Sequence, residues 1–169
     1  RLRRERDVRS PATAMTLVVL VGGARSGKSR LAVERAQAEG TAVTFVATGE
    51  AGDEEMALRI AQHKAERPDG WTTIEEPVDI EGALASVPAG HTVVIDCLSL
   101  WIANGGDGAV PAPRVGLTIA VTNEVGLGIV PVNALARSYR DDLGRVNAAW
   151  VEAADEAYFV VAGKALRLA

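Results

Sequence analysis

An eight-residue glycine-rich loop, GGARSGKS at positions 22–29, narrows the possible folds of this chain more than any other segment does. It follows the pattern G-x-x-x-x-G-K-S and joins an apolar, β-branched run, Thr16–Val21, to a helix-forming stretch, Ser29–Glu39. In such a loop the glycines let backbone N–H groups point at phosphate oxygens, and the helix N-terminus favours negative charge. The lysine reaches the β- and γ-phosphates, and the serine hydroxyl binds Mg²⁺. We therefore predict a nucleotide site with a catalytic lysine, formed by Gly22, Gly23, Ala24, Arg25, Ser26, Gly27, Lys28 and Ser29.

The rest of the chain alternates between apolar runs typical of buried strands and stretches typical of helices. Strands are predicted at Thr16–Val21, Thr41–Ala47, Trp71–Glu75, Thr92–Cys97, Leu117–Thr122, Ala157–Ala162 and Lys164–Leu168. Helices are predicted at Ser29–Glu39, Asp53–Glu66, Asp79–Ser86 and Val132–Ala154. This alternation predicts an α/β fold with a mostly parallel sheet, flanked by helices, that binds ligands at the carboxyl ends of its strands. The length suits one domain, which we place at residues 15–169.

Charge is spread unevenly along the chain, which has a net formal charge of −4. Residues 1–14 carry five arginines and lack apolar periodicity, so we expect a disordered basic arm there. The acidic remainder argues against nucleic acid as a partner. The single cysteine, Cys97, excludes an internal disulfide and suits the cytoplasm. The first apolar run, Leu17–Val21, is too short to span a bilayer, so no stable membrane insertion is expected.

Asp96 ends the buried strand predicted at Thr92–Cys97. Enzymes with a loop of this type place at such a strand end the carboxylate that holds Mg²⁺. We therefore predict a magnesium site formed by Ser29 and Asp96. The alternative is an aspartate that only caps the following turn.

His63 is a candidate nucleophile, because it lies in a predicted helix with cationic residues around it. Arg59 and Arg67 would share its helical face if the helix continued that far, and Lys64 is adjacent. A neutral imidazole can attack an α-phosphate, and the cations would stabilise the leaving pyrophosphate. The alternative is a solvated helix histidine among paired charges. His91 follows Gly90 and is predicted to be a surface turn residue.

Several longer segments resemble one known family. They are GGARSGKS at 22–29, FVATGE at 45–50, DEEMALRIAQHKAERPDGW at 53–71, VVIDCLSLW at 93–101, TNEVGLGIVP at 122–131, LARSYRDDLGRVN at 135–147 and ADEAYFVVAGKALRL at 154–168. From about Thr16 onward the chain is similar to the bifunctional adenosylcobinamide kinase / adenosylcobinamide-phosphate guanylyltransferases.

The resemblance implies two reactions on adenosylcobinamide, a corrinoid. A nucleoside triphosphate, GTP or ATP, phosphorylates its aminopropanol hydroxyl; GMP then passes from GTP, through a guanylyl-histidine at His63, to give adenosylcobinamide-GDP. A RecA-like P-loop NTPase fold and a homotrimer are implied too, and Trp101 and Trp150 are candidates for burial between subunits. The implied nucleotide contacts beyond the loop are Thr48, Gly49, Glu50, Lys64, Ala65, Glu66, Arg67, Glu75 and Asp96.

One segment departs from the family pattern. Family members carry a longer helical stretch where this chain has the short, Gly- and Pro-rich run Asn104–Gly116. Two other functions remain open from the residues themselves. One is a small-molecule P-loop kinase without nucleotidyl transfer, in which His63 is structural. The other is a RecA-like regulatory or nucleic-acid-binding ATPase module, which the acidic body disfavours.

Overall fold

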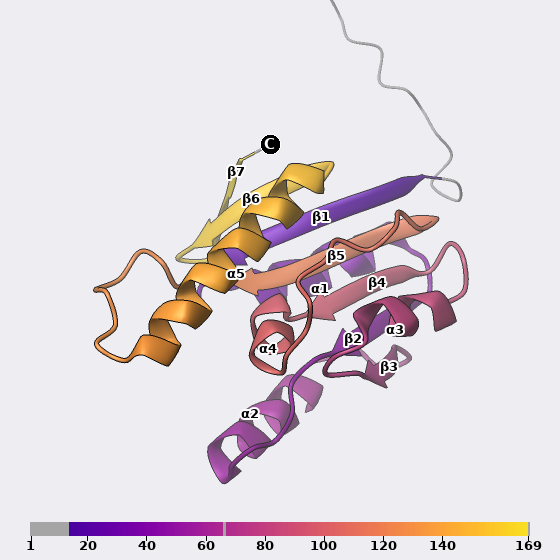
Figure 1. Ribbon diagram of the computed structural model, residues 1–169. Helices are drawn as coiled ribbons and strands as arrows, with labels where there is room; N and C mark the ends of the chain where they lie inside the picture. The colour runs from indigo at the N-terminus through magenta and orange to yellow at the C-terminus, as the bar shows by residue number, and fades with distance from the viewer. Residues whose placement is uncertain (1–13, 66, 169) are drawn as a thin grey trace, which may run out of the picture.

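The computed structural model describes residues 14–65 and 67–168 (Figure 1). All but the last residue of the predicted basic arm, and Glu66, lie outside this part. The strands are β1 Met15–Gly22, β2 Val43–Ala47, β3 Thr72–Glu75, β4 Thr92–Asp96, β5 Gly116–Asn123, β6 Glu156–Val161 and β7 Lys164–Arg167. The helices are α1 Lys28–Glu39, α2 Glu54–Ala65, α3 Ile80–Ser86, α4 Leu98–Ala103 and α5 Ala134–Ala153. No helix in the described part of the chain is both long and apolar enough to cross a membrane.

The strands form one seven-stranded sheet in the order β3-β2-β4-β5-β1-β6-β7. Every neighbouring pair is parallel except β6 and β7, which form an antiparallel hairpin. Gly22 of β1 pairs with Asn123 of β5, and Asp96 of β4 pairs with Val121. The ends of these three strands therefore meet at one edge of the sheet. The predicted α/β class with a mostly parallel sheet is confirmed.

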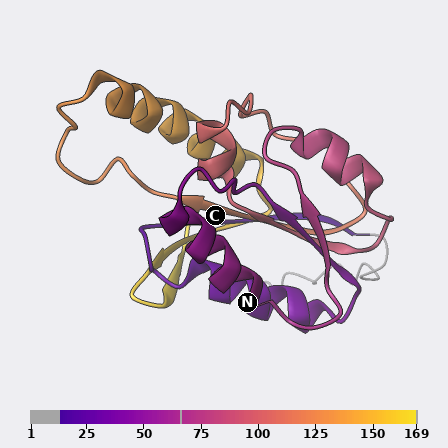
Figure 2. The same cartoon turned by 90° about the horizontal axis from the view of Figure 1, so that it is seen from below.

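Helices cover both faces of the sheet, which explains why its central strands are continuously apolar. On one face α1 packs Ala32 and Ala36 into a core with Val18 and Phe45. Figure 2 shows α3, α4 and α5 on the opposite face. There Trp101 of α4 and Trp150 of α5 meet edge to face, with ring centroids 6.2 Å apart. Since these rings are 3% and 0% exposed within one chain, the expectation that they lie between subunits is wrong.

The sequence predicted each strand and four of the five helices within one or two residues. It missed α4, whose six residues LSLWIA follow directly after a buried strand. Such a run is apolar around most of its circumference and too short to show a helical period, so it reads as an extension of the strand. The predicted helix end at Glu66 falls outside the described residues, and α2 as described ends at Ala65.

The segment between α4 and β5 has no regular secondary structure, in keeping with its glycines and prolines. It lies over the α3–α5 face, where the Trp150 indole N–H donates to the Gly108 carbonyl at 3.2 Å. At Gly106 an added Cβ would lie 2.2 Å from Trp101 Nε1, so only glycine fits this close approach. The short segment thus closes the core over the two tryptophans without the helix that the family pattern led us to expect.

Candidate active site

The glycine-rich loop has the backbone shape that its sequence predicts. Gly27 adopts a left-handed conformation with φ 97° and forms the N-cap of α1, and Arg25 is also left-handed, with φ 55°. At Gly22 an added Cβ would lie 2.4 Å from the Val160 carbonyl oxygen, so a side chain there would collide with backbone of β6. The Gly163 N–H donates to the Ser26 carbonyl at 2.8 Å, which fixes the outer side of the loop to the β6–β7 turn. The sheet itself holds the loop in position.

Lys28 is the most buried charged residue of the loop, and only 8% of its surface is exposed. Its ammonium group donates to the Gly23 carbonyl at 2.9 Å, across the mouth of the loop. Burial lowers the pKa of Lys28 below the ordinary lysine value, while the nearby Cys97 and Asp96 act in the opposite direction. The Ser26 hydroxyl is buried and has no hydrogen-bond partner among the described residues. A phosphate oxygen would satisfy both groups, so the loop fits a triphosphate.

Asp96 ends β4 at the same edge, two strands across from the loop, and its side chain is half-buried. Ser29 lies in the first turn of α1 and is also half-buried. Hydroxyl and carboxylate oxygens are hard donors, and Mg²⁺ is commonly held by one or two protein ligands together with phosphates. No group of three or more His, Cys, Asp or Glu side chains suited to a metal occurs in the described part of the chain. The residues therefore fit a magnesium ion that arrives with its nucleotide rather than one held by the protein alone.

The segment after β2 joins the loop edge to α2. Thr48 is fully buried, and its hydroxyl accepts from the Cys97 N–H at 2.8 Å and donates to the Cys97 carbonyl at 2.7 Å. These bonds tie the end of β2 to the end of β4, so this side chain already has its partners. Gly49 lies under α4 and α2, where an added Cβ would come within 3.3 Å of Leu100 and 3.6 Å of Ile60. Glu50 is exposed, and the nucleotide contacts expected at all three residues remain predictions.

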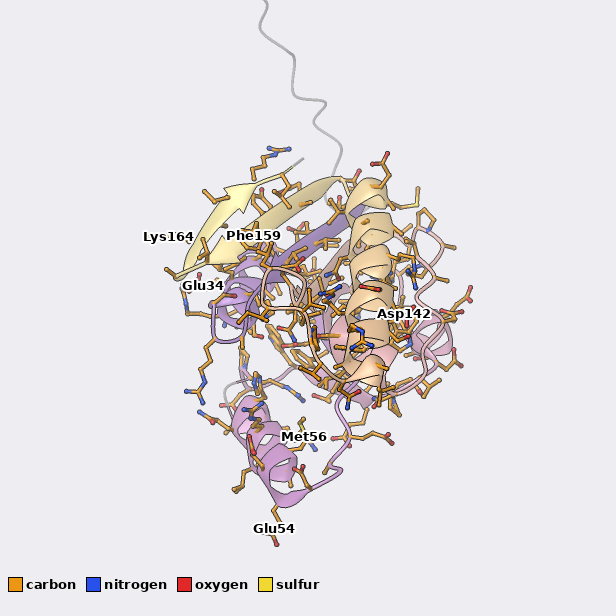
Figure 3. All side chains as sticks on the ribbon, turned by 60° about the vertical axis from the view of Figure 1, so that its left-hand side comes forward. Glu34, Glu54, Met56, Asp142, Phe159 and Lys164 are labelled. Atoms are coloured by element: carbon orange, nitrogen blue, oxygen red, sulfur yellow. The ribbon has the colours of Figure 1, made fainter. Side chains whose placement is uncertain are left out.

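His63 is exposed on α2, a helix with no buried residue. Figure 3 shows α2 standing away from the body, with Glu54 at its outer end. Arg59 pairs with Glu55 one turn away at 3.1 Å. Arg67 would share the helical face of His63 only if the helix reached it, and α2 as described ends at Ala65, so Arg67 lies beyond the helix.

Arg67 instead turns back toward the sheet. Its guanidinium lies 4.0 Å from the centroid of the Phe45 ring and donates to the Thr73 hydroxyl at 3.3 Å. Burial lowers the pKa of Arg67, and Asp96 and Glu75 counteract this effect. Its Nε is buried without a hydrogen-bond partner among the described residues. Like the Ser26 hydroxyl, it is a buried polar atom that a bound anion would satisfy.

A hollow of about 350 Å³ opens beside Arg67, between the end of α2 and β3. Lys64 and Glu75 form an ion pair across it, and this lysine lowers the pKa of Glu75. Trp71 supplies an aromatic wall. Ala65, also expected to contact nucleotide, is exposed at the end of α2, whereas Glu66 lies outside the described residues. The structure thus brings Lys64, Arg67 and Glu75 together, next to the helix that carries His63.

Two polar residues that the sequence analysis did not single out share the edge with the loop. Asn123 ends β5 and donates to the Ser99 hydroxyl at 2.8 Å, and the N–H of Glu124 donates to the Gly22 carbonyl at 3.0 Å. The available signal was their place directly after a buried apolar run, where parallel sheets carry functional side chains.

A strand–loop–helix phosphate cradle with an acidic strand end in the same edge of the sheet defines the class of P-loop nucleotide-binding proteins. Comparison with known proteins narrows this class. The family model described as cobinamide kinase / cobinamide phosphate guanyltransferase matches residues 18–110 and 109–168. The chain belongs to this family.

Named relatives agree with the family match. The chain is 42% identical over 164 residues to the bifunctional adenosylcobalamin biosynthesis protein CobP of Pseudomonas aeruginosa, and the alignment covers 86% of this chain and 92% of the relative. It is 34% identical over 180 residues to the bifunctional adenosylcobalamin biosynthesis protein CobU of Escherichia coli, and that alignment covers 90% of this chain and 99% of the relative. The family match falls into two pieces that meet at residues 109–110, inside the short segment between α4 and β5. The departure expected at Asn104–Gly116 therefore coincides with the break in the match.

Proposed function

We propose that this chain phosphorylates adenosylcobinamide at its aminopropanol hydroxyl and then transfers GMP from GTP to the product through His63, forming adenosylcobinamide-GDP. Family membership supports the pair of reactions, and the phosphate loop supports the first one directly. The observation that carries the proposal is the preformed cradle. It combines the buried Lys28, the Ser26 hydroxyl, which has no hydrogen-bond partner among the described residues, and Asp96 at the end of a strand two positions away in the sheet. The lysine and the hydroxyl suit a triphosphate, and the aspartate suits the Mg²⁺ that accompanies it.

In the kinase reaction the loop binds the triphosphate of GTP or ATP, and Lys28 neutralises charge on the β- and γ-phosphates. Ser29 and Asp96 would hold Mg²⁺, which supplies further charge neutralisation between the phosphates when bound. The backbone N–H groups of the loop and the α1 N-terminus orient the γ-phosphate. Positioning and charge stabilisation account for most catalysis of phosphoryl transfer, so this rigid part of the fold meets the main requirement.

In the transferase reaction the imidazole of His63 attacks the α-phosphate of GTP, and pyrophosphate leaves. The support from geometry is that His63 is exposed to a ligand and lies in the last turn of a helix followed by Lys64 and Arg67. These cations suit the charge that develops on the leaving group. The hollow lined by Trp71 and Glu75 would take the base, since its wall offers an aromatic face and a hydrogen-bond acceptor.

Labelling with α-labelled GTP tests the proposal and separates it from a simple kinase. Wild-type protein with Mg²⁺ should gain one covalent GMP, visible by mass spectrometry, and the phosphoramidate should be acid-labile and stable to alkali. His63→Ala should lose the label and keep kinase turnover, because the loop is untouched. The matched control is His91→Ala, whose imidazole lies 3.5 Å from the Thr44 hydroxyl and outside the site. Labelling of His63→Ala, or a label that survives acid, would show that another residue is the nucleophile, whereas the absence of any label on the wild type would assign the chain to the simple kinases.

We also propose that the chain assembles as a homotrimer with the site near a subunit boundary, as the family resemblance implies. The β5–α5 loop supports self-association, because Leu127, Ile129 and Val132 are 80%, 98% and 98% exposed. Several exposed apolar side chains close together in one loop form the kind of surface that a partner can cover. Light scattering at micromolar concentration should give three times the mass of one chain. Ile129→Asp should reduce it, whereas the control Leu168→Asp should not; a monomeric wild type would contradict the proposal.

A further inference from the structure

Glu124 is the first residue after β5, the strand that lies between the phosphate-loop strand β1 and the Asp96 strand β4. Its N–H donates to the carbonyl of Gly22, the first residue of the loop, at 3.0 Å. The backbone of Glu124 is therefore attached to the loop itself. Glu124 thus lies at the edge of the sheet that carries the phosphate loop.

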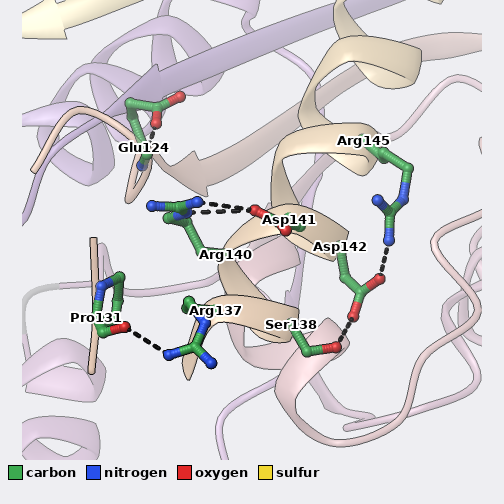
Figure 4. A network of polar contacts seen from close by, with 9 residues as sticks. Glu124, Pro131, Arg137, Ser138, Arg140, Asp141, Asp142 and Arg145 are labelled. Atoms are coloured by element: carbon green, nitrogen blue, oxygen red, sulfur yellow. Dashed lines mark hydrogen bonds and ion pairs between the residues drawn. The ribbon is translucent and has the colours of Figure 1, made fainter. Parts of the chain in front are cut away.

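The carboxylate of Glu124 has little to neutralise it. It accepts from the N–H of Gly126, two residues along the loop, as the dashed line in Figure 4 shows. Arg140 and Arg137 lie on the nearby part of α5, but the former pairs with Asp141 and the latter donates to the carbonyls of Pro131 and Val132. Within residues 14–65 and 67–168, no basic side chain forms an ion pair with Glu124. One oxygen thus anchors the loop, and the carboxylate retains further acceptor capacity.

The other carboxylates at this edge already have partners or lie elsewhere. Asp96 faces the charges of Lys28 and Arg67, and it is our candidate for the cation site. Glu75 is paired with Lys64 on the far side of β2. Glu50 is exposed on the connection to α2. Among the described residues, Glu124 is thus the carboxylate without a cationic partner that lies beside the loop.

Phosphorylation of an alcohol requires a group that orients the hydroxyl and takes its proton, a role that carboxylates fill in other phosphotransferases. We propose that Glu124 is the catalytic base of the kinase reaction, an inference that rests on the proposed function. The hydroxyl O–H bond breaks and its proton passes to a Glu124 carboxylate oxygen. The hydroxyl oxygen bonds to the γ-phosphorus, and the bond from that phosphorus to the β–γ bridging oxygen breaks. Nucleoside diphosphate leaves, and Glu124 later releases the proton to water.

Two substitutions at Glu124 separate this role from loop anchoring. Glu124→Gln keeps an oxygen that can accept from the Gly126 N–H but cannot take a proton, whereas Glu124→Ala removes both functions. We expect Glu124→Gln to lower kinase kcat by about 10²- to 10⁴-fold, with an unchanged KM for the nucleotide and without the acidic limb of the wild-type pH profile. Covalent labelling by α-labelled GTP without acceptor should stay normal, which shows that the variant is folded and binds nucleotide. Glu152→Gln, the same change at an exposed position in the last turn of α5, should match wild type.

The outcomes distinguish failure of the Glu124 assignment from failure of the proposed kinase function. Normal kcat and a normal pH profile in Glu124→Gln, with a loss only in Glu124→Ala, would reduce Glu124 to a loop anchor and leave the proposed function intact. Equal loss of kinase turnover and of GMP labelling in Glu124→Gln would also overturn the assignment, because a base for the hydroxyl plays no part in labelling. Failure of the wild type to phosphorylate adenosylcobinamide would overturn both the proposed kinase function and this inference.

Discussion

Helices α1 and α2 lie beside neighbouring parts of the candidate site, and they differ in how closely they pack against the rest of the molecule. Helix α1 begins at the phosphate loop and buries Lys28, Ala32 and Ala36 against the sheet. Helix α2 carries His63 and buries no residue. Both have 12 residues, so the contrast lies in their packing rather than in their length.

In the proposed mechanism, the kinase and transferase reactions therefore depend on the fold to different degrees. The phosphate loop is held by β6, by the β6–β7 turn and by its own helix before any ligand arrives. The surroundings of His63 depend on exposed ion pairs, which contribute little to stability. If His63 carries the GMP, as we propose, bound nucleotide or a neighbouring subunit would supply the remaining contacts around it.

Within this comparison, the largest effect on turnover is expected at the phosphate loop, which is preformed. Lys28→Met keeps the apolar stem and removes the charge, so kinase turnover should fall about 100- to 1,000-fold, a loss of roughly 3–4 kcal/mol in transition-state stabilisation. Burial lowers the pKa of Lys28, which means that the unfolded chain holds this proton more tightly and that the charge costs stability at neutral pH. The melting temperature of Lys28→Met should therefore not fall. Lys164→Met on β7 is the control, and near-normal turnover of Lys28→Met would remove the loop from the kinase site.

Hydrogen exchange measures the contrast between the helices directly. Without nucleotide, the amides in the middle of α2 should exchange at least about 100-fold faster than those of α1, because opening α2 exposes no buried side chain. Addition of GTP and Mg²⁺ should reduce the difference in exchange rate between the two helices. Equal protection of the two helices in the free protein would contradict the comparison.

Asp96 lies between the two regions, since it faces both Lys28 and Arg67. Asp96→Asn keeps the shape and removes the charge, so the Mg²⁺ concentration for half-maximal kinase rate should rise by about 10-fold. The free energy of unfolding should change by less than about 1 kcal/mol. Titration of the kinase rate with MgCl₂ gives the first quantity and urea unfolding the second. An unchanged Mg²⁺ titration would leave Asp96 as a turn-capping residue.

The smallest effect is expected in the hollow beside α2. The hydrogen bond and the charge of Lys64 lower the pKa of Glu75, so any stabilisation is present above the ordinary glutamate pKa and is lost as pH falls through the lower folded value. The pair is exposed, and Glu75→Gln should change the free energy of unfolding at pH 7 by less than about 1 kcal/mol. Urea unfolding at pH 7 and pH 3 should show that the variant and wild type converge at the lower pH. A large difference at pH 3 would mean that Glu75 acts through another contact.

The sequence predicted most of the fold and the phosphate loop, because both depend on local patterns. Apolar runs identified the strands, and the glycine, lysine and serine spacing identified the cradle around Lys28. The direction of Arg67 was not predictable in this way, since it depends on where α2 ends and on the Phe45 ring far back in the chain. Glu124 was overlooked because its position beside Gly22 follows from strand order, which periodicity does not show.

The three tryptophans of the chain divide between the two faces of the sheet. Trp101 and Trp150 are sealed in the α4–α5 core, whereas Trp71 is half-buried in the hollow with Lys64, Arg67 and Glu75. Their fluorescence should therefore separate two events without any added dye. Emission from Trp71 should respond when a nucleotide enters, and emission from the buried pair should shift to the red only when the core opens. The fluorescence of Trp71 would thus report nucleotide binding, and that of Trp101 and Trp150 would report unfolding of the core.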